Sequence, residues 1–196
     1  MTRYAHSLPP SYFDERYAEN PDPWEFETSE YERAKYAATL DALPRARYAS
    51  ALEVGCSIGV LTEALATRCD ALVSLDLAER ALARARERCR DLTHVRFQLA
   101  QVPGQWPEGA FDLILLSEVV YYLDADDLAR LVDRVRGCLQ PGGDVVLVHW
   151  TGETHYPLTG DEAAGHFIAG AGDFLHVHGQ TRTDKYRLDM LVRDGA

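Results

Sequence analysis

A glycine turn between a short apolar strand and a helix constrains this chain more than any other feature. Residues 51–62 read Ala-Leu-Glu-Val-Gly-Cys-Ser-Ile-Gly-Val-Leu-Thr, and the next apolar run, residues 71–75, ends at Asp76. Gly55 and Gly59 bracket a bend in which the backbone can approach a ligand closely. An acid at the tip of the following strand can accept hydrogen bonds from ribose hydroxyls. Together these features predict a site for a ligand with an adenosyl part.

The spacing of the turn selects among such ligands. A dinucleotide site requires Gly-x-Gly-x-x-Gly, whose loop and helix N-terminus hold a pyrophosphate. This chain has Glu53-x-Gly55-x-x-x-Gly59 instead. The carboxylate of Glu53 would repel a phosphate and attract a cationic amino-acid tail. An NAD-dependent oxidoreductase is therefore disfavoured, and a chance strand–turn–helix unit is the remaining alternative for the turn taken alone.

Strand and helix patterns alternate through most of the chain. The sequence predicts seven strands, over residues 51–54, 71–75, 94–98, 111–116, 144–149, 174–178 and 186–192. Helical patterns fall between them, over residues 59–68, 78–89, 124–139 and 160–169. Such alternation predicts an α/β fold with a doubly wound, Rossmann-like, mostly parallel sheet. The last two strands are expected to form a C-terminal antiparallel hairpin.

The length of 196 residues indicates one domain. We divide it into an N-terminal lid segment at 1–44, a cofactor-binding core at 45–150, and a substrate-side segment with the terminal hairpin at 151–196. Within the lid segment, Ser29 is the expected N-cap of a helix. Ligands of such sheets bind beyond the carboxyl ends of the strands, so the residues that follow the strands are expected to gather on one rim.

Composition excludes several classes of partner. A net charge of −11 argues against nucleic acid, which requires a clustered basic surface. The one arginine-rich stretch, residues 80–90, has the pattern of a solvated helix face rather than of a phosphate-binding patch. No apolar run approaches the ~20 residues of a membrane span, and the N-terminus lacks the apolar core of a signal peptide. We therefore expect a cytoplasmic protein. The four cysteines have no Cys-x-x-Cys spacing and the histidines match no common ligand motif, so no metal is expected.

The motifs resemble a known family. Glu53-x-Gly55-x-x-x-Gly59 with Asp76 is similar to motifs I and II of class I S-adenosylmethionine-dependent methyltransferases. Gly-Ala-Phe-Asp-Leu-Ile at 109–114 and Leu-Gln-Pro-Gly-Gly-Asp-Val at 139–145 resemble their later motifs. Pro-Asp-Pro-Trp at 21–24 and Ser-Glu-Val-Val-Tyr-Tyr-Leu at 117–123 resemble the NodS branch. That branch methylates the free amine of a deacetylated chitooligosaccharide.

The resemblance implies a role for each residue near the cofactor. S-adenosylmethionine is the implied cofactor and S-adenosylhomocysteine its product. Gln101 stands where the family usually has an adenine-binding Asp, and its amide can serve the same role. The implied cofactor-binding residues are Glu53 at the methionine end, Gly55, Cys56 and Gly59 in the turn, Asp76 at the ribose, Leu77, Ala100, Gln101 and Val102 at the adenine, Ser117 after the fourth strand, and Trp24, Tyr31 and Arg33 in the lid.

The residues after the fourth and fifth strands are candidates for catalysis. An amine acceptor must be neutral before it attacks, so a nearby group has to orient it or accept its proton. Glu118 is the first choice for this role, with His149 second and Tyr121 as a further candidate. We expect a small-molecule substrate, with an amino sugar or related amine as first choice. An O-methyltransferase acting on a sugar or natural-product hydroxyl, and a non-catalytic protein that binds S-adenosylmethionine, are the alternatives.

Overall fold

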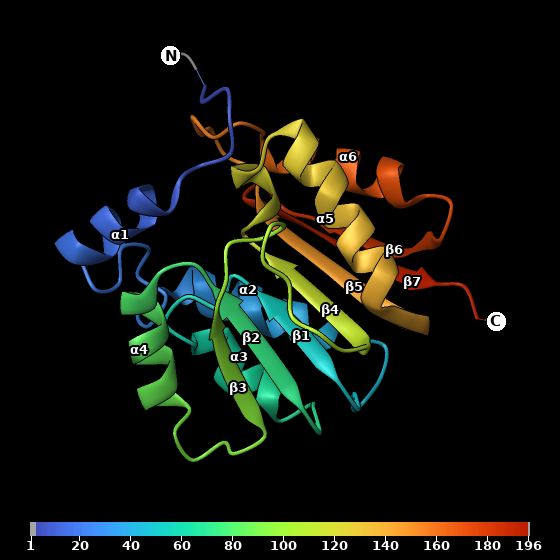
Figure 1. Cartoon of the computed structure of the whole chain (residues 1–196), viewed down its shortest axis with the longest axis horizontal. Coiled ribbons are helices and arrows are strands. Elements are labelled where there is room, and N and C mark those ends of the chain that lie inside the picture. Colours follow the sequence, from blue (N-terminus) through green and yellow to red (C-terminus); the bar gives the residue numbers. More distant parts are fainter. Residues whose placement is uncertain (1–2, 196) are drawn as a thin grey trace. The chain divides into compact units, whose positions relative to one another are not determined.

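The computed structural model describes residues 3–195, which separate into two compact units. Residues 9–101 form the first, here called the N-terminal unit, and residues 3–8 with 102–195 form the second, called the C-terminal unit. The seven strands have the sheet order β3-β2-β1-β4-β5-β7-β6 (Figure 1). The predicted α/β fold with a mostly parallel sheet and an antiparallel C-terminal hairpin is confirmed.

The N-terminal unit contains three parallel strands and four helices. Its strands pair in the order β3-β2-β1, with Val54 opposite Leu75 and Asp76 opposite Leu99. The parallel register brings the ends of β1 and β2 to one edge, which places the glycine turn beside Asp76. The elements are α1 (Pro10–Glu19), α2 (Glu30–Asp41), β1 (Ala51–Val54), α3 (Val60–Ala66), β2 (Leu72–Asp76), α4 (Glu79–Arg88) and β3 (Val95–Leu99).

The first helix was not predicted from the sequence. Residues 11–18 show no clear apolar stripe, yet α1 buries the two aromatic side chains Phe13 and Tyr17 and contacts α4. Long-range packing therefore decides this helix, because its local pattern is weak. The expected N-cap at Ser29 is confirmed, since its hydroxyl accepts a hydrogen bond from the amide of Glu32 at 3.3 Å.

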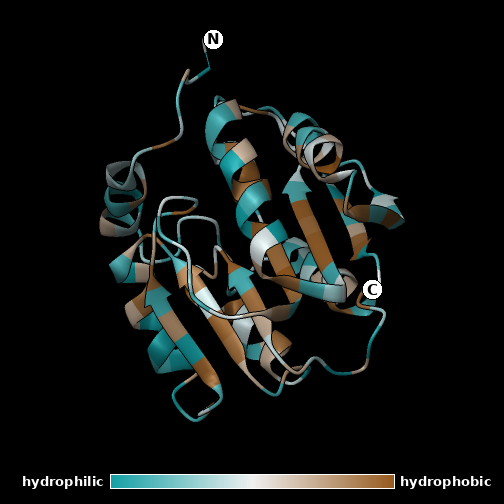
Figure 2. Cartoon of the chain, turned by 45° about the vertical axis from the view of Figure 1, so that its right-hand side comes forward, coloured by the Kyte–Doolittle hydropathy of each residue, from teal (hydrophilic) through white to brown (hydrophobic). Residues whose placement is uncertain are grey.

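The C-terminal unit contains the other four strands. β4 and β5 are parallel, whereas β7 is antiparallel to both β5 and β6. Hydrophobic residues concentrate along the strands, and the helices carry hydrophilic residues on their outer surfaces (Figure 2). The elements are β4 (Phe111–Ser117), the 3-10 helix η1 (Val120–Tyr122), α5 (Ala125–Cys138), β5 (Leu139–Trp150), α6 (Gly160–Ala171), β6 (Leu175–Arg182) and β7 (Tyr186–Arg193).

The terminal hairpin is longer than its apolar pattern indicates. We expected β6 to end near residue 178, but it pairs with β7 as far as Arg182 opposite Arg187, with a bulge between Val177 and Gly179. Polar cross-strand contacts hold this extension, which has little apolar surface to bury. The apolar pattern of a sequence does not reveal such a strand, because that pattern reflects only the side chains that are buried.

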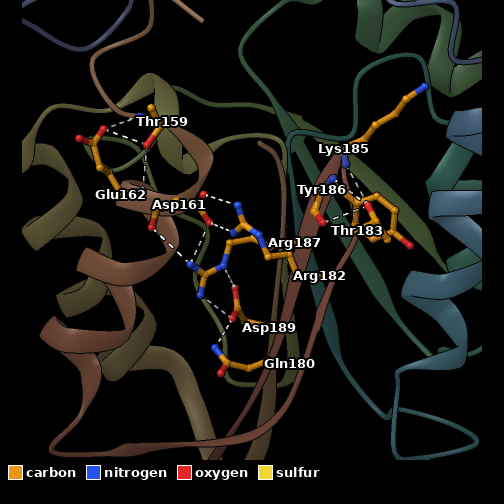
Figure 3. A network of polar contacts seen from close by, with 10 residues as sticks. All are labelled: Thr159, Asp161, Glu162, Gln180, Arg182, Thr183, Lys185, Tyr186, Arg187 and Asp189. Atoms are coloured by element: carbon orange, nitrogen blue, oxygen red, sulfur yellow. Dashed lines mark hydrogen bonds and ion pairs between the residues drawn. The ribbon is translucent and has the colours of Figure 1, made fainter. Parts of the chain in front are cut away.

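An ion-pair network joins the hairpin to the start of α6 (Figure 3). Asp161, in the first turn of α6, accepts hydrogen bonds from Arg182 at 2.8 Å and from Arg187 at 3.4 Å. Arg187 also binds Asp189 through two bonds of 2.8 Å, and Gln180 donates to Asp189 at 2.6 Å. Because Asp189 is only 1% exposed, these bonds offset the cost of burying its charge.

Candidate functional site

The glycine turn between β1 and α3 has left-handed backbone at three positions. The φ angles are +85° at Gly55, +49° at Ser57 and +81° at Gly59. The amides of Gly55 and Cys56 both donate to the carbonyl oxygen of Leu75, at 2.8 and 2.9 Å. These bonds fasten the turn to the end of β2. The predicted close bend is therefore present, and two of its three left-handed positions are glycines, as the steric argument requires.

Gly59 also allows α3 to approach α4. A Cβ atom at this position would lie 2.9 Å from the Cα of Ala85. We expect Gly59→Ala to lower the free energy of unfolding by about 2 kcal/mol. The change places a side chain on left-handed backbone and brings its Cβ atom into a clash with the backbone of α4. Chemical denaturation measures this change. Gly165→Ala is the matched control, since a Cβ there meets nothing within 4 Å; an equal loss in both variants would contradict the explanation.

Asp76 is oriented by backbone donors of its own unit. One carboxylate oxygen accepts from the amide of Ser57 at 2.8 Å, and the other from the amide of Ala78 at 2.9 Å. Burial raises the pKa of Asp76, and the backbone donors oppose that shift. Each carboxylate oxygen has two lone pairs, so the side chain keeps acceptor capacity for further donors such as hydroxyls.

The residues predicted to surround an adenine lie near the ends of β2 and β3. Leu77 follows Asp76 and is partly exposed. Ala100 is buried, and its amide donates to the carbonyl oxygen of Asp76 at 2.9 Å. Gln101 is exposed and ends the N-terminal unit, whereas Val102 begins the C-terminal unit. The contact of these side chains with an adenine stays a prediction.

Glu53 is buried more deeply than expected of a side chain that contacts a bound ligand directly. It is 1% exposed, and one carboxylate oxygen accepts from the hydroxyls of Thr62 at 2.7 Å and Ser74 at 2.8 Å. Burial raises the pKa of Glu53 to about 7, against the two hydroxyl donors, and the charge of Asp76 adds to the rise. At neutral pH this carboxyl is therefore poised between its two protonation states.

This raised pKa predicts a pH-dependent stability. The folded protein keeps the Glu53 proton up to about pH 7, whereas the unfolded chain releases it near pH 4.5. The Glu53 contribution to the free energy of unfolding should therefore fall as pH rises from about 4.5 to about 7 and change little above that.

Glu53→Gln should remove this part of the pH dependence, and denaturant unfolding from pH 4.5 to 8 measures it. Glu63→Gln, at an exposed position of α3, is the control and should keep the wild-type slope. An unchanged slope in Glu53→Gln would show that another group titrates.

The predicted lid residues occupy different environments. Trp24 packs edge-on against Tyr17 at 5.5 Å between ring centroids and stacks on Phe26 at 5.7 Å. The ring of Tyr31 faces the ammonium group of Lys35 at 5.1 Å. Arg33 is exposed on α2. Contact between these three residues and a cofactor stays a prediction.

The loop before α2 is fastened to α4 by arginines. Arg84 donates to the carbonyl oxygen of Pro21 at 2.6 Å and to Glu27 at 2.8 Å, and Arg88 also pairs with Glu27. The sequence pattern of this arginine-rich helix indicated only a solvated face. Part of that face instead anchors the loop that carries Trp24, a long-range contact that helical periodicity does not contain.

In the C-terminal unit, Glu118 follows β4 in a strained backbone conformation. Ser117 ends the strand and is 7% exposed, and Glu118 has a φ of +56°. One carboxylate oxygen of Glu118 accepts from the hydroxyl of Tyr121 at 2.6 Å and from the amide of Trp150 at 2.9 Å. Non-glycine residues held in such conformations cluster at functional sites. This supports the choice of Glu118 as a candidate without assigning its chemistry.

An aromatic cluster surrounds this carboxylate. Tyr121 stacks on Tyr156 at 5.1 Å and meets Tyr122 edge-on at 4.6 Å, and Tyr122 meets Tyr156 at 4.6 Å. Burial raises the pKa values of Tyr121 and Tyr122, and the Glu118 charge adds to both shifts. Both hydroxyls therefore stay protonated at neutral pH, so Tyr121 serves as a donor to Glu118.

His149 has the geometry of a packed histidine. It is 0% exposed, and its Nε2 accepts a hydrogen bond from the amide of Val120 at 3.2 Å. An accepting Nε2 carries no proton, so the neutral ring holds its proton on Nδ1. His149 thus braces η1, the segment that carries Tyr121. Its role as a second proton acceptor stays a prediction.

Three residues close to these groups were not among the predicted site residues. Tyr17 contacts the hydroxyl of Ser57 inside the glycine turn at 2.5 Å, and Tyr156 completes the tyrosine cluster. Ser57 lies within the motif itself and was the one that local sequence could have indicated. Tyr17 and Tyr156 reach their neighbours through tertiary contacts.

Residues 3–195 lack two other kinds of feature. In this range, no group of three or more His, Cys, Asp or Glu side chains is arranged to hold a metal ion. No helix in the same range has both the length and the apolar character needed to cross a membrane.

Relatives of known family match much of the chain. Nodulation protein S of Sinorhizobium fredii is 35% identical over 127 residues, which cover 64% of this chain and 59% of that protein. Nodulation protein S of Rhizobium tropici is 36% identical over 127 residues, which cover 64% of this chain and 53% of that protein. The match thus spans little more than half the length of these curated relatives.

Solved structures share the fold. A protein from Pseudomonas syringae is 41% identical, with a TM-score of 0.73 over 84% of this chain and all of that one. The N-methyltransferase NodS from Bradyrhizobium japonicum WM9, solved in complex with S-adenosyl-L-homocysteine, superposes with a TM-score of 0.78. That alignment covers 94% of this chain and 98% of NodS at 24% identity, which shows a common fold.

The family model for nodulation protein S matches residues 13–148, well over half of the chain. The matched range includes the last seven residues of α1, the glycine turn, Asp76 and Glu118, together with all of β1 to β4. Most of the candidate site therefore lies in the part of the chain that the family shares, and this chain belongs to the nodulation protein S (NodS) family.

Proposed function

We propose that this chain is an S-adenosylmethionine-dependent methyltransferase that methylates an amine nitrogen of a small molecule, with an amino sugar or related amine as the acceptor. The observation that carries the proposal is the pairing of the glycine turn with Asp76. A left-handed turn leaves its main chain open to close approach, and the neighbouring carboxylate is oriented yet retains acceptor capacity. The NodS relative solved with S-adenosyl-L-homocysteine supports the same choice of ligand.

The residues of the N-terminal unit fit such a cofactor. Asp76 would accept hydrogen bonds from the ribose hydroxyls, and Gly55, Cys56 and Gly59 would lie beneath the methionine part. Glu53 would support the cationic amino group from below, because a nearby cation favours its ionised form. When bound, S-adenosylmethionine supplies an activated sulfonium methyl group. The protein then has to align the acceptor and exclude water.

Glu118 is the proposed group that orients the acceptor amine or accepts its proton. Two neutral donors, the hydroxyl of Tyr121 and the amide of Trp150, hold its carboxylate in one orientation without changing its charge. A fixed carboxylate favours a cationic ammonium group over a neutral hydroxyl as its partner. This favours nitrogen over oxygen as the methylated atom. His149 and Tyr121 support the position of Glu118 in this proposal.

Two measurements test the proposed function. Calorimetry should detect micromolar binding of S-adenosylhomocysteine and no binding of NAD. Incubation with S-adenosylmethionine and a chitooligosaccharide that carries a free amine should then yield an N-methylated product by mass spectrometry, while the fully N-acetylated oligosaccharide stays unchanged. Binding of NAD would overturn the choice of cofactor. Cofactor binding with methylation of hydroxyls alone would favour an O-methyltransferase, and binding without turnover of any acceptor would favour a non-catalytic protein.

A further inference from the structure

Ser57 adopts a backbone conformation in which glycine would be more stable. Its φ angle of +49° lies in the left-handed region, where a side chain crowds the backbone. Gly55 and Gly59, on either side of it in the same turn, take left-handed angles without this cost. A serine at the middle position therefore needs a compensating interaction.

The hydroxyl of Ser57 provides that interaction. Its Oγ lies 2.5 Å from the hydroxyl oxygen of Tyr17, which reaches it from α1. The amide of the same serine donates to Asp76 at 2.8 Å. One strained residue thus links α1, through Tyr17, to the carboxylate that is proposed to bind ribose.

Tyr17 has a second contact with the proposed cofactor site. It is 6% exposed, and its ring packs edge-on against Trp24, one of the predicted lid residues. Burial raises the pKa of Tyr17, with the Asp76 charge adding to the rise, so the hydroxyl stays protonated at any physiological pH. Its hydrogen bond to Ser57 is therefore available across the working range of the protein.

We propose that Tyr17 and Ser57 are cofactor-positioning residues. Their paired hydroxyls hold α1 and Trp24 in a fixed position beside the glycine turn, and this position sets the affinity for S-adenosylmethionine. This inference rests on the proposed function. Loss of either hydroxyl leaves the backbone bond from Ser57 to Asp76 in place. It removes one link between α1 and the turn, so Trp24, a predicted lid residue, would be held less firmly for contact with a bound cofactor.

The test compares variants that remove the hydroxyl pair in different ways. Tyr17→Phe and Ser57→Gly should each weaken binding of S-adenosylhomocysteine by about 10-fold, because each removes the same buried hydrogen bond. The double variant should also lose about 10-fold rather than 100-fold, since nothing is left for the second change to remove. Calorimetry measures all of these affinities without the need for an acceptor.

Two further variants separate positioning from general stability. Ser57→Ala removes the hydroxyl but keeps the strained backbone, so it should bind as weakly as Ser57→Gly while unfolding at a lower temperature. Tyr12→Phe, on the same helix, should bind like the wild type. Hydrogen exchange of residues 10–19 in the presence of saturating S-adenosylhomocysteine should be faster in Tyr17→Phe than in Tyr12→Phe.

The outcomes distinguish the two proposals. Wild-type affinity in Tyr17→Phe and Ser57→Gly would overturn the positioning role, even if α1 exchanges faster. Multiplication of the two losses in the double variant would also overturn it, because the hydroxyls would then act independently. Failure of the wild type to bind S-adenosylhomocysteine would instead overturn the proposed function, and the positioning role with it.

Discussion

Replacing Asp76 by alanine is expected to weaken binding of S-adenosylhomocysteine by about 10²- to 10⁴-fold. Two charge-assisted hydrogen bonds to ribose hydroxyls would be lost, at about 1.5–3 kcal/mol each. The same change removes the acceptor for the amides of Ser57 and Ala78, so the turn and the start of α4 lose their common anchor. Calorimetric titration of the wild type and the variant gives the ratio of dissociation constants.

Two variants control for the structural role of Asp76. Asp76→Asn keeps one oxygen acceptor and should bind with intermediate affinity. Glu79→Ala removes an exposed acid from the first turn of α4, so it tests the effect of negative charge near the start of that helix. Glu79→Ala should retain wild-type affinity. If Asp76→Ala binds as tightly as the wild type, the assignment of the ribose site is wrong.

Replacing Glu118 by glutamine is expected to lower kcat by about 10²- to 10³-fold while the affinity for S-adenosylhomocysteine changes less than about twofold. The amide oxygen of glutamine can still accept from Tyr121 and from Trp150, so the local structure is retained. What is lost is the negative charge that would orient an ammonium group or take its proton. Initial rates with the free-amine oligosaccharide and calorimetry with the product separate the two effects.

A tyrosine variant and a surface variant complete this experiment. Tyr121→Phe removes one donor to Glu118 but leaves the charge, so its loss in kcat should be smaller than that of Glu118→Gln. Glu153→Gln changes an exposed glutamate of the same unit and should have no effect. Wild-type turnover in Glu118→Gln would remove this residue from the mechanism. A matching loss of cofactor affinity would place it in the cofactor site instead.

Much of the architecture was predictable because it depends on local patterns. The run at 111–116 is apolar except for Asp112, as expected of a strand buried on both faces, and β4 spans Phe111–Ser117. The N-cap predicted at Ser29 follows from a side chain that bonds to the amide three residues later, and that bond is present. The extension of β6 was missed because polar contacts rather than apolar burial hold it.

The candidate site divides in the same way. The glycine turn and Asp76 follow β1 and β2, and Glu118 follows β4, so the strand pattern was enough to predict that each lies at the end of a strand of its own unit. The sequence could not reveal that Glu53 is buried with two hydroxyl donors, or that Nε2 of His149 is engaged by a backbone amide. Both facts depend on which neighbours the fold supplies.

The sequence by itself determined the order of strands and helices from β1 onward, the glycine turn and the acids that follow the strands, because these depend on periodicity and on local steric limits. Only the tertiary structure decided that Tyr17 meets Ser57, that Arg84 and Arg88 hold the loop before α2, and that Tyr156 joins the tyrosines beside Glu118. These contacts join residues far apart in the chain. Their energies arise from desolvation and side-chain geometry, which exist only once the chain has folded.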